Sequence, residues 1–416
     1  MTTSELFLIF FGGLIPLLAT AFWLGRRQAM TWEGNGQRPM SRPGYYGWFL
    51  FFGSGGPAVV TALGFAVLHL AGLYSAPPML LFAAALACGA GGLTWTLRRI
   101  HPKYNARRYV ENTVRGLMWM SATLSILTTI GIVLSVLLEA LRFFHQVGFW
   151  SFITGTEWEA DSAFLIGAGR GDEGVAPPKF GAVPIFAGTF MITLIAMLVA
   201  VPFGLFSAIY LSEYAGKRLR AAAKPMLEIL AGIPTVVYGF FAAITVSPLI
   251  VEIAHGLGLE ADYVNALSPG IVMGIMIIPF VSSLSDDVIH AVPQALRDGS
   301  LALGMTRSET IRHVVLPAAM PGIVSAFLLA VSRAIGETMI VVMAAGLRPN
   351  LTWNPLEGMT TVTVKIVESL TGDQEFDSAL TLSAFALGLV LLVVTLLLNI
   401  VSTYIIHRFK KQYALV

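Results

Sequence analysis

The stretch DGSLALGMTRSETIRHVVLP, Asp298 to Pro317, is polar and helical in pattern and lies between two long apolar segments. Its apolar residues are spaced to line one side of two short helices, and Gly304 provides a turn between them. Leu316 and Pro317 are expected to end the second helix, because proline cannot continue a helix. These apolar residues are Leu301, Leu303, Met305, Ile311, Val314 and Val315. The stretch therefore predicts a docking surface for a partner protein, and the alternative is an ordinary loop between spans.

The composition of the chain is that of a membrane protein. Of its 416 residues, 56% are hydrophobic and 12% are charged, and that fraction of charge is too small for the surface of a soluble protein. We predict an all-α, polytopic membrane protein with about nine transmembrane helices, each a window of about 20 apolar residues. The windows are Leu6–Leu24, Trp48–Leu73, Ala76–Leu97, Gly116–Leu138, Pro184–Leu211, Met226–Ile250, Pro269–Leu284, Gly322–Ala345 and Leu380–Ile406.

The distribution of basic residues predicts the orientation of these helices. With nine spans and a cytoplasmic C-terminus, the inside loops hold 20 lysines and arginines, the outside loops hold 5, and Arg333 lies within a span. The positive-inside rule then gives an N-out, C-in topology. We expect the first span to be retained in the membrane, although Ala19-Thr20-Ala21 leaves a cleaved signal peptide open.

A basic segment, Arg98 to Arg115, divides the chain. We predict an N-terminal three-helix membrane extension at residues 1–105 and a six-helix core at 106–416, with a cytoplasmic coupling loop at 285–320. Asp286 and Asp287 open this loop and are expected to cap its first helix. The role of residues 1–100 is left open between a packing collar and a regulatory module.

The sequence contains no motif for catalysis, and we predict that the chain is not an enzyme. The glycine-rich segment Gly167–Gly174 lacks the Lys-Ser/Thr ending of a phosphate loop, and the seven histidines are scattered without metal-ligand spacing. Cys88 is the only cysteine, so no internal disulfide forms. The basic residues are spread over the loops as topology signals, which argues against nucleic acid as a partner. We predict no cofactor or metal in this chain.

Arg333 and Glu337 are the strongest candidates for a site. They lie four residues apart in a predicted span, where an i, i+4 pair shares one helix face. Charged residues at membrane depth are costly and tend to mark a pathway, and a guanidinium holds tetrahedral oxyanions through two parallel donors. We predict that both residues, with Ser332 and Thr338, line the path of an anion. The alternative is a buried ion pair that only fixes helix packing.

Two other carboxylates have less specific interpretations. Glu228 is expected either to line an inner vestibule or to serve as a satisfied residue near a helix end. Glu213 ends a span beside Lys217 and Arg218, and local ion pairing with these cations accounts for it.

The spacing within Asp298–Pro317 resembles the cytoplasmic "EAA" signature of ABC-importer permeases. That signature runs E-A-A, three residues, G, nine residues, I, any residue, L-P. The matching residues here are Asp298, Gly299, Ser300, Gly304, Val314, Leu316 and Pro317. The spacing is kept while the opening triad differs, and the resemblance implies that these residues couple the chain to an ATPase subunit.

A narrower resemblance covers residues from about Gly116 to the C-terminus. The run SRAIGETM, Ser332–Met339, is similar to the R-A-x-G-E-T-M motif of the phosphate-specific (PstC-type) permeases of type I ABC importers. Three further stretches agree, namely Phe152–Asp161, Val183–Ala215 and Leu227–Phe241. The family's pathway arginine and glutamate correspond to Arg333 and Glu337. The N-terminal hundred residues are a departure, because the usual permease has six helices.

The resemblance implies the permease subunit of an ATP-driven inorganic phosphate importer in the bacterial inner membrane. The expected partners are a sister permease, two ATPase subunits that bind ATP and Mg²⁺, and a periplasmic phosphate-binding protein. Two alternatives remain: a permease for another oxyanion such as molybdate, sulfate or phosphonate, and a phosphate-sensing membrane scaffold that transports little. An intramembrane enzyme is disfavoured, because nucleophile, base and metal ligands are not clustered.

Overall fold

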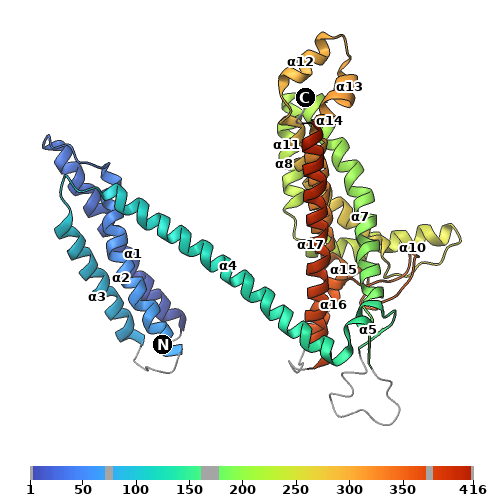
Figure 1. Ribbon diagram of the computed structural model, residues 1–416, viewed down its shortest axis with the longest axis horizontal. Helices are drawn as coiled ribbons and strands as arrows, with labels where there is room; N and C mark the ends of the chain where they lie inside the picture. The colour runs from blue at the N-terminus through green and yellow to red at the C-terminus, as the bar shows by residue number, and fades with distance from the viewer. Residues whose placement is uncertain (1–2, 71–77, 161–177, 372–377, 414–416) are drawn as a thin grey trace. The chain divides into compact units, whose positions relative to one another are not determined.

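The computed structural model describes residues 3–70, 78–160, 178–371 and 378–413, and nearly all of them are helical (Figure 1). The contacts within the chain divide it into two units, Met1–Gly131 and Ile132–Val416. The division falls inside the long helix α4, Ala106–Val147. The boundary that we predict from the sequence, at residues 105 and 106, instead lies where α4 begins.

Unit 1 contains three helices before α4: α1 (Thr3–Gly34), α2 (Pro43–Leu70) and α3 (Pro78–Arg99). Both α1 and α3 pack on α2, and small residues let the backbones approach closely. A Cβ added at Gly53 of α2 would lie 2.2 Å from Cγ2 of Thr96 on α3. The core includes the buried Tyr46, whose hydroxyl donates to the carbonyl oxygen of Tyr104 at 2.9 Å.

Unit 2 is built on α7, α11, α14 and α17, which lie alongside one another (Figure 1). Its elements are α5 (Phe149–Thr154), β1 (Trp158–Glu159), β2 (Lys179–Phe180), α7 (Val183–Ile209), η1 (Tyr210–Tyr214), α8 (Lys217–Ala231), α9 (Thr235–Phe241), η2 (Ala242–Val246), α10 (Ser247–Gly256), α11 (Leu267–His290), α12 (Gln294–Ala302), α13 (Arg307–Thr310), η3 (Ile311–Val315), α14 (Leu316–Ile335), α15 (Met339–Ala344), α16 (Val362–Leu370) and α17 (Ala379–Tyr413). The central core is lined by small and long apolar residues such as Ala196, Met273 and Ile277.

Eight helical stretches in the described residues are long and apolar enough to cross a membrane. Six of them lie in residues 106–405 and agree with the expected six-helix core. The first predicted span, Leu6–Leu24, lies within α1. This helix is continuous but is not among the eight stretches. The eight stretches are Pro43–Leu68, Met79–Arg99, Ala106–Val147, Val183–Tyr214, Thr235–Gly256, Leu267–His290, Arg307–Ile335 and Ala379–Ile405.

Two of the predicted spans differ from the observed helices. The helical run predicted at Met226–Ile250 is broken between Ala231 and Thr235, and the spanning helix is Thr235–Gly256. Pro234 explains the break, because proline disfavours helical conformation in the residue before it. The span predicted at Gly322–Ala345 ends at Ile335, and α15 is too short to cross a membrane.

The expectation that Leu316 and Pro317 end the second docking helix is wrong. The helix runs without interruption from Arg307 through η3 into α14. The N–H of Leu316 donates to the carbonyl of Ile311, five residues earlier, so the turn before Pro317 is a wider π-helical turn. The wide turn accommodates a residue that has no N–H and crowds the preceding turn. The same arrangement occurs at η2, where Pro248 follows the turn.

An aromatic cluster closes one end of unit 2. Phe143 of α4, Phe152 of α5 and Phe180 of β2 are buried together. The strands β1 and β2 pair antiparallel, with Trp158 opposite Phe180. Phe143, Phe152, Trp158 and Phe180 therefore form a packed core, and the glycine-rich segment Gly167–Gly174 lies outside the described residues.

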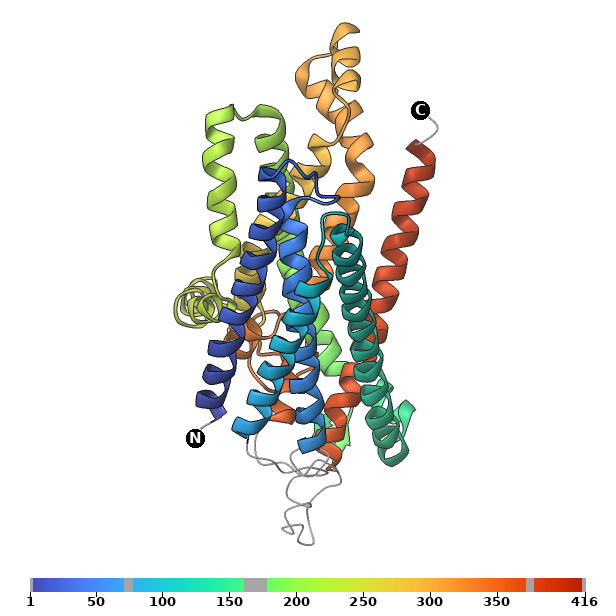
Figure 2. The same cartoon turned by 90° about the vertical axis from the view of Figure 1, so that its left-hand side faces the viewer.

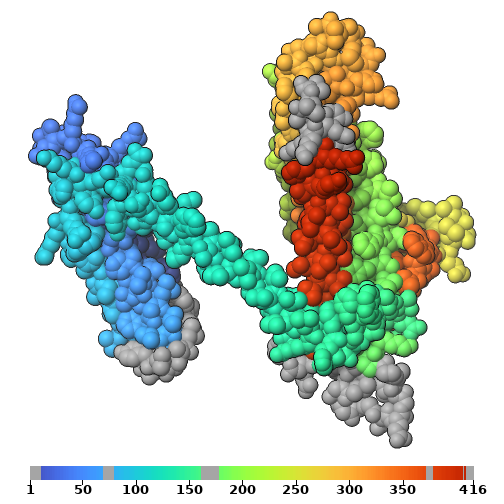
Figure 3. All heavy atoms as spheres, in the orientation of Figure 1, coloured from blue at the N-terminus to red at the C-terminus, as the bar shows by residue number. Residues whose placement is uncertain are grey.

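The opposite end of unit 2 carries α12 and α13, which project beyond α11 and α14 (Figure 2). Figure 3 shows them as a knob on the surface of this unit. Within the predicted coupling loop, residues 285–290 belong to α11 and residues 316–320 to α14. Asp286 and Asp287 therefore lie in the last turns of α11. The expectation that they cap the first helix of the loop, α12, is wrong.

We predict that Gly322→Ala destabilises the contact between α14 and α11. A Cβ at Gly322 would lie 2.3 Å from Cγ1 and 2.6 Å from Cγ2 of Val288. Overpacking of this kind costs about 1–3 kcal/mol, so the thermal unfolding midpoint of the purified protein in detergent should fall.

The second change Val288→Ala removes both methyl groups and should restore part of the lost stability. Gly256→Ala is the control, because no atom lies within 4 Å of a Cβ at that position. Equal losses in the Gly322→Ala single variant and the double variant would contradict this account of the contact.

Candidate functional site

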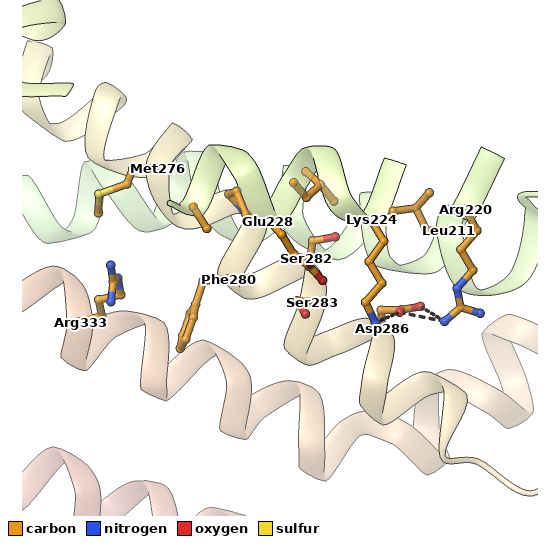
Figure 4. A pocket seen from close by; sticks show the side chains of 13 residues that line it. Leu211, Arg220, Lys224, Glu228, Met276, Phe280, Ser282, Ser283, Asp286 and Arg333 are labelled. Atoms are coloured by element: carbon orange, nitrogen blue, oxygen red, sulfur yellow. Dashed lines mark hydrogen bonds and ion pairs between the residues drawn. The ribbon is translucent and has the colours of Figure 1, made fainter. Parts of the chain in front are cut away.

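A cavity of about 280 Å³ lies between α8, α11 and α14 in unit 2 (Figure 4). Helix α8 contributes Arg220, Lys224 and Glu228, whose four-residue spacing places them on one helix face. Helix α11 contributes the lining residues Met276, Pro279, Phe280, Ser282, Ser283 and Asp286. The cavity thus collects charged side chains from two helices, together with Arg333 of α14.

Arg333 occupies one end of this cavity, beside Met276 and Phe280 (Figure 4). Its guanidinium carbon lies 5.9 Å from the centre of the Phe280 ring, a distance at which a cation is attracted to the ring face. Among the described residues, Arg333 makes no ion pair and no hydrogen bond through its side chain. Its donors therefore remain available to an anion in the cavity.

The other end of the cavity is occupied by ion pairs between α8 and α11 (Figure 4). Nη2 of Arg220 donates to both carboxylate oxygens of Asp286, at 3.0 and 2.9 Å, and Nζ of Lys224 lies 3.4 Å from Oδ2 of the same group. Lys224 also pairs with Asp287 at 3.2 Å. The hydrogen bond to Asp287, with the charges of Asp287 and Asp286, raises the pKa of Lys224 above its ordinary value, so this amine stays protonated at neutral pH.

The middle of the cavity carries Glu228, Ser282 and Ser283 (Figure 4). Ser282 is buried, and its Oγ has no hydrogen-bond partner in the described part of the chain. An unpaired buried hydroxyl is costly in a native structure and calls for a partner that binds there. Glu228 lines the cavity, and its place in an inner vestibule stays a prediction.

The other predicted pathway residues are not in the lining of this cavity. Helix α14 ends at Ile335, so Arg333 and Glu337 do not share one helix face, and the expectation based on their spacing is wrong. Oε1 of Glu337 instead accepts the N–H of Met339 at 3.1 Å at the start of α15. Thr338 is the N-cap residue of α15, and Oγ of Ser332 lies 3.5 Å from Oδ1 of Asn399 on α17.

The helix breaks between α14 and α15 because the intervening residues, Gly336, Glu337 and Thr338, favour the end of one helix and the start of the next. Gly336 is a weak helix former, and the Glu337 carboxylate satisfies amides at the start of α15 that have no partner within the helix. The backbone carbonyl of Glu337 also accepts the hydroxyl of Thr363, at 2.9 Å.

The docking segment has the two-piece form that its sequence predicts. Helix α12 ends at Ala302, and Gly304 adopts a φ of 87°, a conformation that favours glycine. Thr306 and Glu309 then form a reciprocal capping box at the start of α13. Asp298 and Gly299 are exposed, whereas Ser300 is buried against Thr310, with 2.9 Å between their hydroxyl oxygens. Val314, Leu316 and Pro317 are half-buried in η3 and the start of α14.

A buried ion pair anchors α12 to η1. Nη2 of Arg297 lies 2.9 Å from Oε1 of Glu213, and the two side chains are only 12% and 10% exposed. Arg297 also donates to the carbonyl of Ile289, in the last turn of α11, and to that of Val292, two residues beyond the end of this helix. The guanidinium of Arg307 donates to the carbonyl of Glu213. The expectation that Glu213 pairs locally with Lys217 and Arg218 is therefore wrong, because Arg297 provides a buried partner with several donors.

Sequence reasoning missed the cluster of Arg220, Lys224 and Asp286. The four-residue spacing of the two cations was visible, but their partner lies 62 positions beyond Lys224, and only the packing of α8 on α11 brings them together.

Comparisons with known proteins agree with this fold. Residues 200–411 match the family model described as "Binding-protein-dependent transport system inner membrane component". The "Probable ABC transporter permease protein YqgH" of Bacillus subtilis is 32% identical over 302 residues, which cover 71% of this chain and 92% of that protein. "Phosphate transport system permease protein PstC 1" of Mycobacterium tuberculosis is 34% identical over 324 residues, covering 72% of this chain and 93% of the relative.

Solved structures of ABC transporters are more distant. A bacterial alginate ABC transporter in complex with a pentasaccharide-bound periplasmic protein is 16% identical, with a TM-score of 0.48, and the match covers 73% of this chain and 99% of that chain. The methionine transporter MetNI, in an inward-facing form, is 18% identical, with a TM-score of 0.40 and coverage of 55% and 94%.

The family is one of permeases, in agreement with the prediction that this chain is not itself an enzyme. Systems of this family also contain ATPase and substrate-binding proteins. With eight helices able to cross a membrane among its described residues, this chain is a multi-pass protein of the bacterial inner membrane and belongs to the family of binding-protein-dependent transport system inner membrane components.

Proposed function

We propose that this chain is the permease subunit of an ATP-driven importer of inorganic phosphate. The observation that carries the proposal is the unpaired guanidinium of Arg333 in a cavity between α8, α11 and α14. A guanidinium at membrane depth is costly unless it meets a partner or water, and its planar donors match a tetrahedral oxyanion. The relatives named as phosphate transport permeases support phosphate as that anion.

Glu337 has an indirect role in this proposal. Its carboxylate caps α15 and its carbonyl accepts from Thr363, so it fixes the break that follows Arg333. Ser332 and Thr338 lie on either side of this break. The proposal keeps the prediction that both line the path of the anion. Molybdate or sulfate would meet the same donors, and a sensing scaffold would need no transport at all, so uptake has to be measured.

The knob formed by α12 and α13 is the proposed docking site for an ATPase subunit. Leu303 is 85% exposed at the turn between the two helices, and Leu301 beside it is also exposed. Exposed apolar side chains on a rigid turn suit insertion into a groove on a partner. The other proposed partners are a sister permease, a second ATPase copy and a periplasmic phosphate-binding protein.

We predict that Arg333→Gln abolishes phosphate uptake while the complex still assembles. The glutamine keeps much of the side-chain length but carries no charge, so the anion loses its strongest partner in this cavity. The measurement is uptake of labelled phosphate by cells or proteoliposomes, together with co-purification of the partner subunits.

Arg142→Gln is the matched control, because Arg142 lies on the exposed surface of α4, paired with Glu139. Unchanged uptake in the Arg333→Gln variant would overturn the pathway role. Loss of assembly along with uptake would assign Arg333 to packing.

We predict that Gly304→Pro uncouples the transporter. Proline fixes φ near −65°, whereas Gly304 has a φ of 87°, so the turn that presents Leu303 must change. ATP hydrolysis stimulated by the loaded binding protein should fall at least tenfold, about the effect of losing 1.4 kcal/mol of productive contact. Gly256→Pro, at the last residue of α10, tests whether a proline introduced at a helix end elsewhere in the chain has this effect. Normal stimulation in Gly304→Pro would refute the docking assignment.

We predict that Glu213→Ala loosens the anchor of α12. The change leaves Arg297 buried without its carboxylate partner, and breaking a buried pair in this way costs about 3–5 kcal/mol. The thermal unfolding midpoint should fall, and Arg297 and Arg307 should become more accessible to trypsin. Glu260→Ala, at an exposed position, should change neither property.

A further inference from the structure

The carboxylate of Asp286 occupies a position that suits an inorganic oxyanion. Its side chain is only 5% exposed, and it accepts hydrogen bonds from Arg220 and Lys224 of the neighbouring helix. A carboxylate and a phosphate or sulfate offer the same acceptors to a guanidinium. Asp286 is therefore an internal stand-in for such an anion.

We propose that Arg220 and Lys224 form a second oxyanion site, which Asp286 fills in this structure and from which a transported anion displaces it. The proposal rests on the proposed function, because it adds a second anion-binding site, or station, to the path that begins at Arg333. Figure 4 shows the two stations at opposite ends of the same cavity.

The cations retain donor capacity beyond Asp286. Arg220 uses only Nη2 for both Asp286 oxygens, and its Nη1 lies 3.3 Å from Nδ1 of His290. Lys224 divides its donors between Asp286 and Asp287, and its contact with Asp286 is long, at 3.4 Å. An oxyanion with three or four acceptor oxygens would engage more of these donors than one carboxylate does.

Ser282 is a second and independent pointer to a ligand. Its buried Oγ lines the cavity without a hydrogen-bond partner in the described residues. Ser282 precedes Asp286 by about one turn of α11, so an anion that reaches from Arg220 and Lys224 toward the middle of the cavity would give this hydroxyl a partner and remove the cost of leaving it unpaired. Ser283, the next lining residue, offers another hydroxyl.

The charges along the cavity favour two separate stations. Three cations, Arg220, Lys224 and Arg333, line the cavity against two carboxylates, Glu228 and Asp286. Glu228 lies between the two ends (Figure 4) and repels an anion in the middle. An anion leaving Arg333 is therefore stabilised next at Arg220 and Lys224, where Asp286 competes with it.

Displacement of Asp286 would also change the contact between two helices. In the described residues, the ion pairs that join α8 to α11 are those of Arg220 and Lys224 with Asp286 and Asp287. An anion that takes both cations weakens these pairs, so α8 can part from the end of α11. Arrival of the anion then opens the cavity at this end.

Two variants separate this site from a salt bridge that only holds the fold together. Asp286→Asn removes the competing charge and keeps the side-chain shape, and both cations remain. The triple variant Arg220→Gln, Lys224→Gln, Asp286→Asn also removes the cations. Both variants lack the ion pair with Asp286, so a purely structural role predicts that they bind anions equally.

The experiment measures equilibrium binding of labelled inorganic phosphate to the purified transporter complex, without nucleotide and without the soluble binding protein. Asp286→Asn should bind phosphate at least about tenfold more tightly than the wild type, because a like charge beside the anion is removed. The triple variant should lose this gain. Equal binding by Asp286→Asn and the triple variant would overturn the proposal.

Controls distinguish failure of the proposed second oxyanion site from failure of the proposed function. Co-purification and thermal unfolding establish that each variant assembles, and Glu260→Gln, at an exposed position, should bind like the wild type. Placing Arg333→Gln in the Asp286→Asn background should leave the second site intact. Binding of sulfate but not phosphate by Asp286→Asn would support the site and contradict the phosphate assignment, and binding of neither anion would overturn the site.

Discussion

The need to give a charged side chain a partner in an apolar protein is met by ion pairs at one end of unit 2. At the end that carries α12 and α13, Arg297 is held by Glu213 and two backbone carbonyls, and Arg220 is held by Asp286. In the part of the chain that the structure describes, the side chain of Arg333 contacts the face of Phe280 and makes no ion pair. Since an unpaired guanidinium at membrane depth is costly, the proposed pathway begins at Arg333.

Backbone groups obey the same constraint where the spans are irregular. Pro248 and Pro317 follow π-helical turns, in which the N–H groups of Ser247 and Leu316 reach carbonyls five residues earlier. At the break between α14 and α15, the carboxylate of Glu337 takes the place of the missing helical acceptor. At each of these three irregularities a nearby acceptor therefore takes a backbone N–H group.

Local patterns in the sequence predicted much of the fold. Apolar windows predicted six spanning helices in the core, and Gly304 predicted the turn between α12 and α13. The failures occurred where a distant partner decides the outcome. Glu213 pairs with Arg297, 84 positions away, instead of with the nearby lysine and arginine. The four-residue spacing of Arg333 and Glu337 predicted a shared helix face only if the helix continued, and capping of α15 ended it.

The cavity and the docking knob share two structural elements. Leu211 of η1 lines the cavity, and Glu213, two residues later, receives the ion pair from α12. On α11, Asp286 holds Arg220, and the carbonyl of Ile289, almost one helical turn later, accepts from Arg297. In the proposed mechanism, a displacement of α12 by an ATPase subunit would act within one turn of both the cavity wall and Asp286. Arg297 contacts both elements at once, so the proposal assigns to it the link between motion of α12 and release of an anion from Arg220 and Lys224.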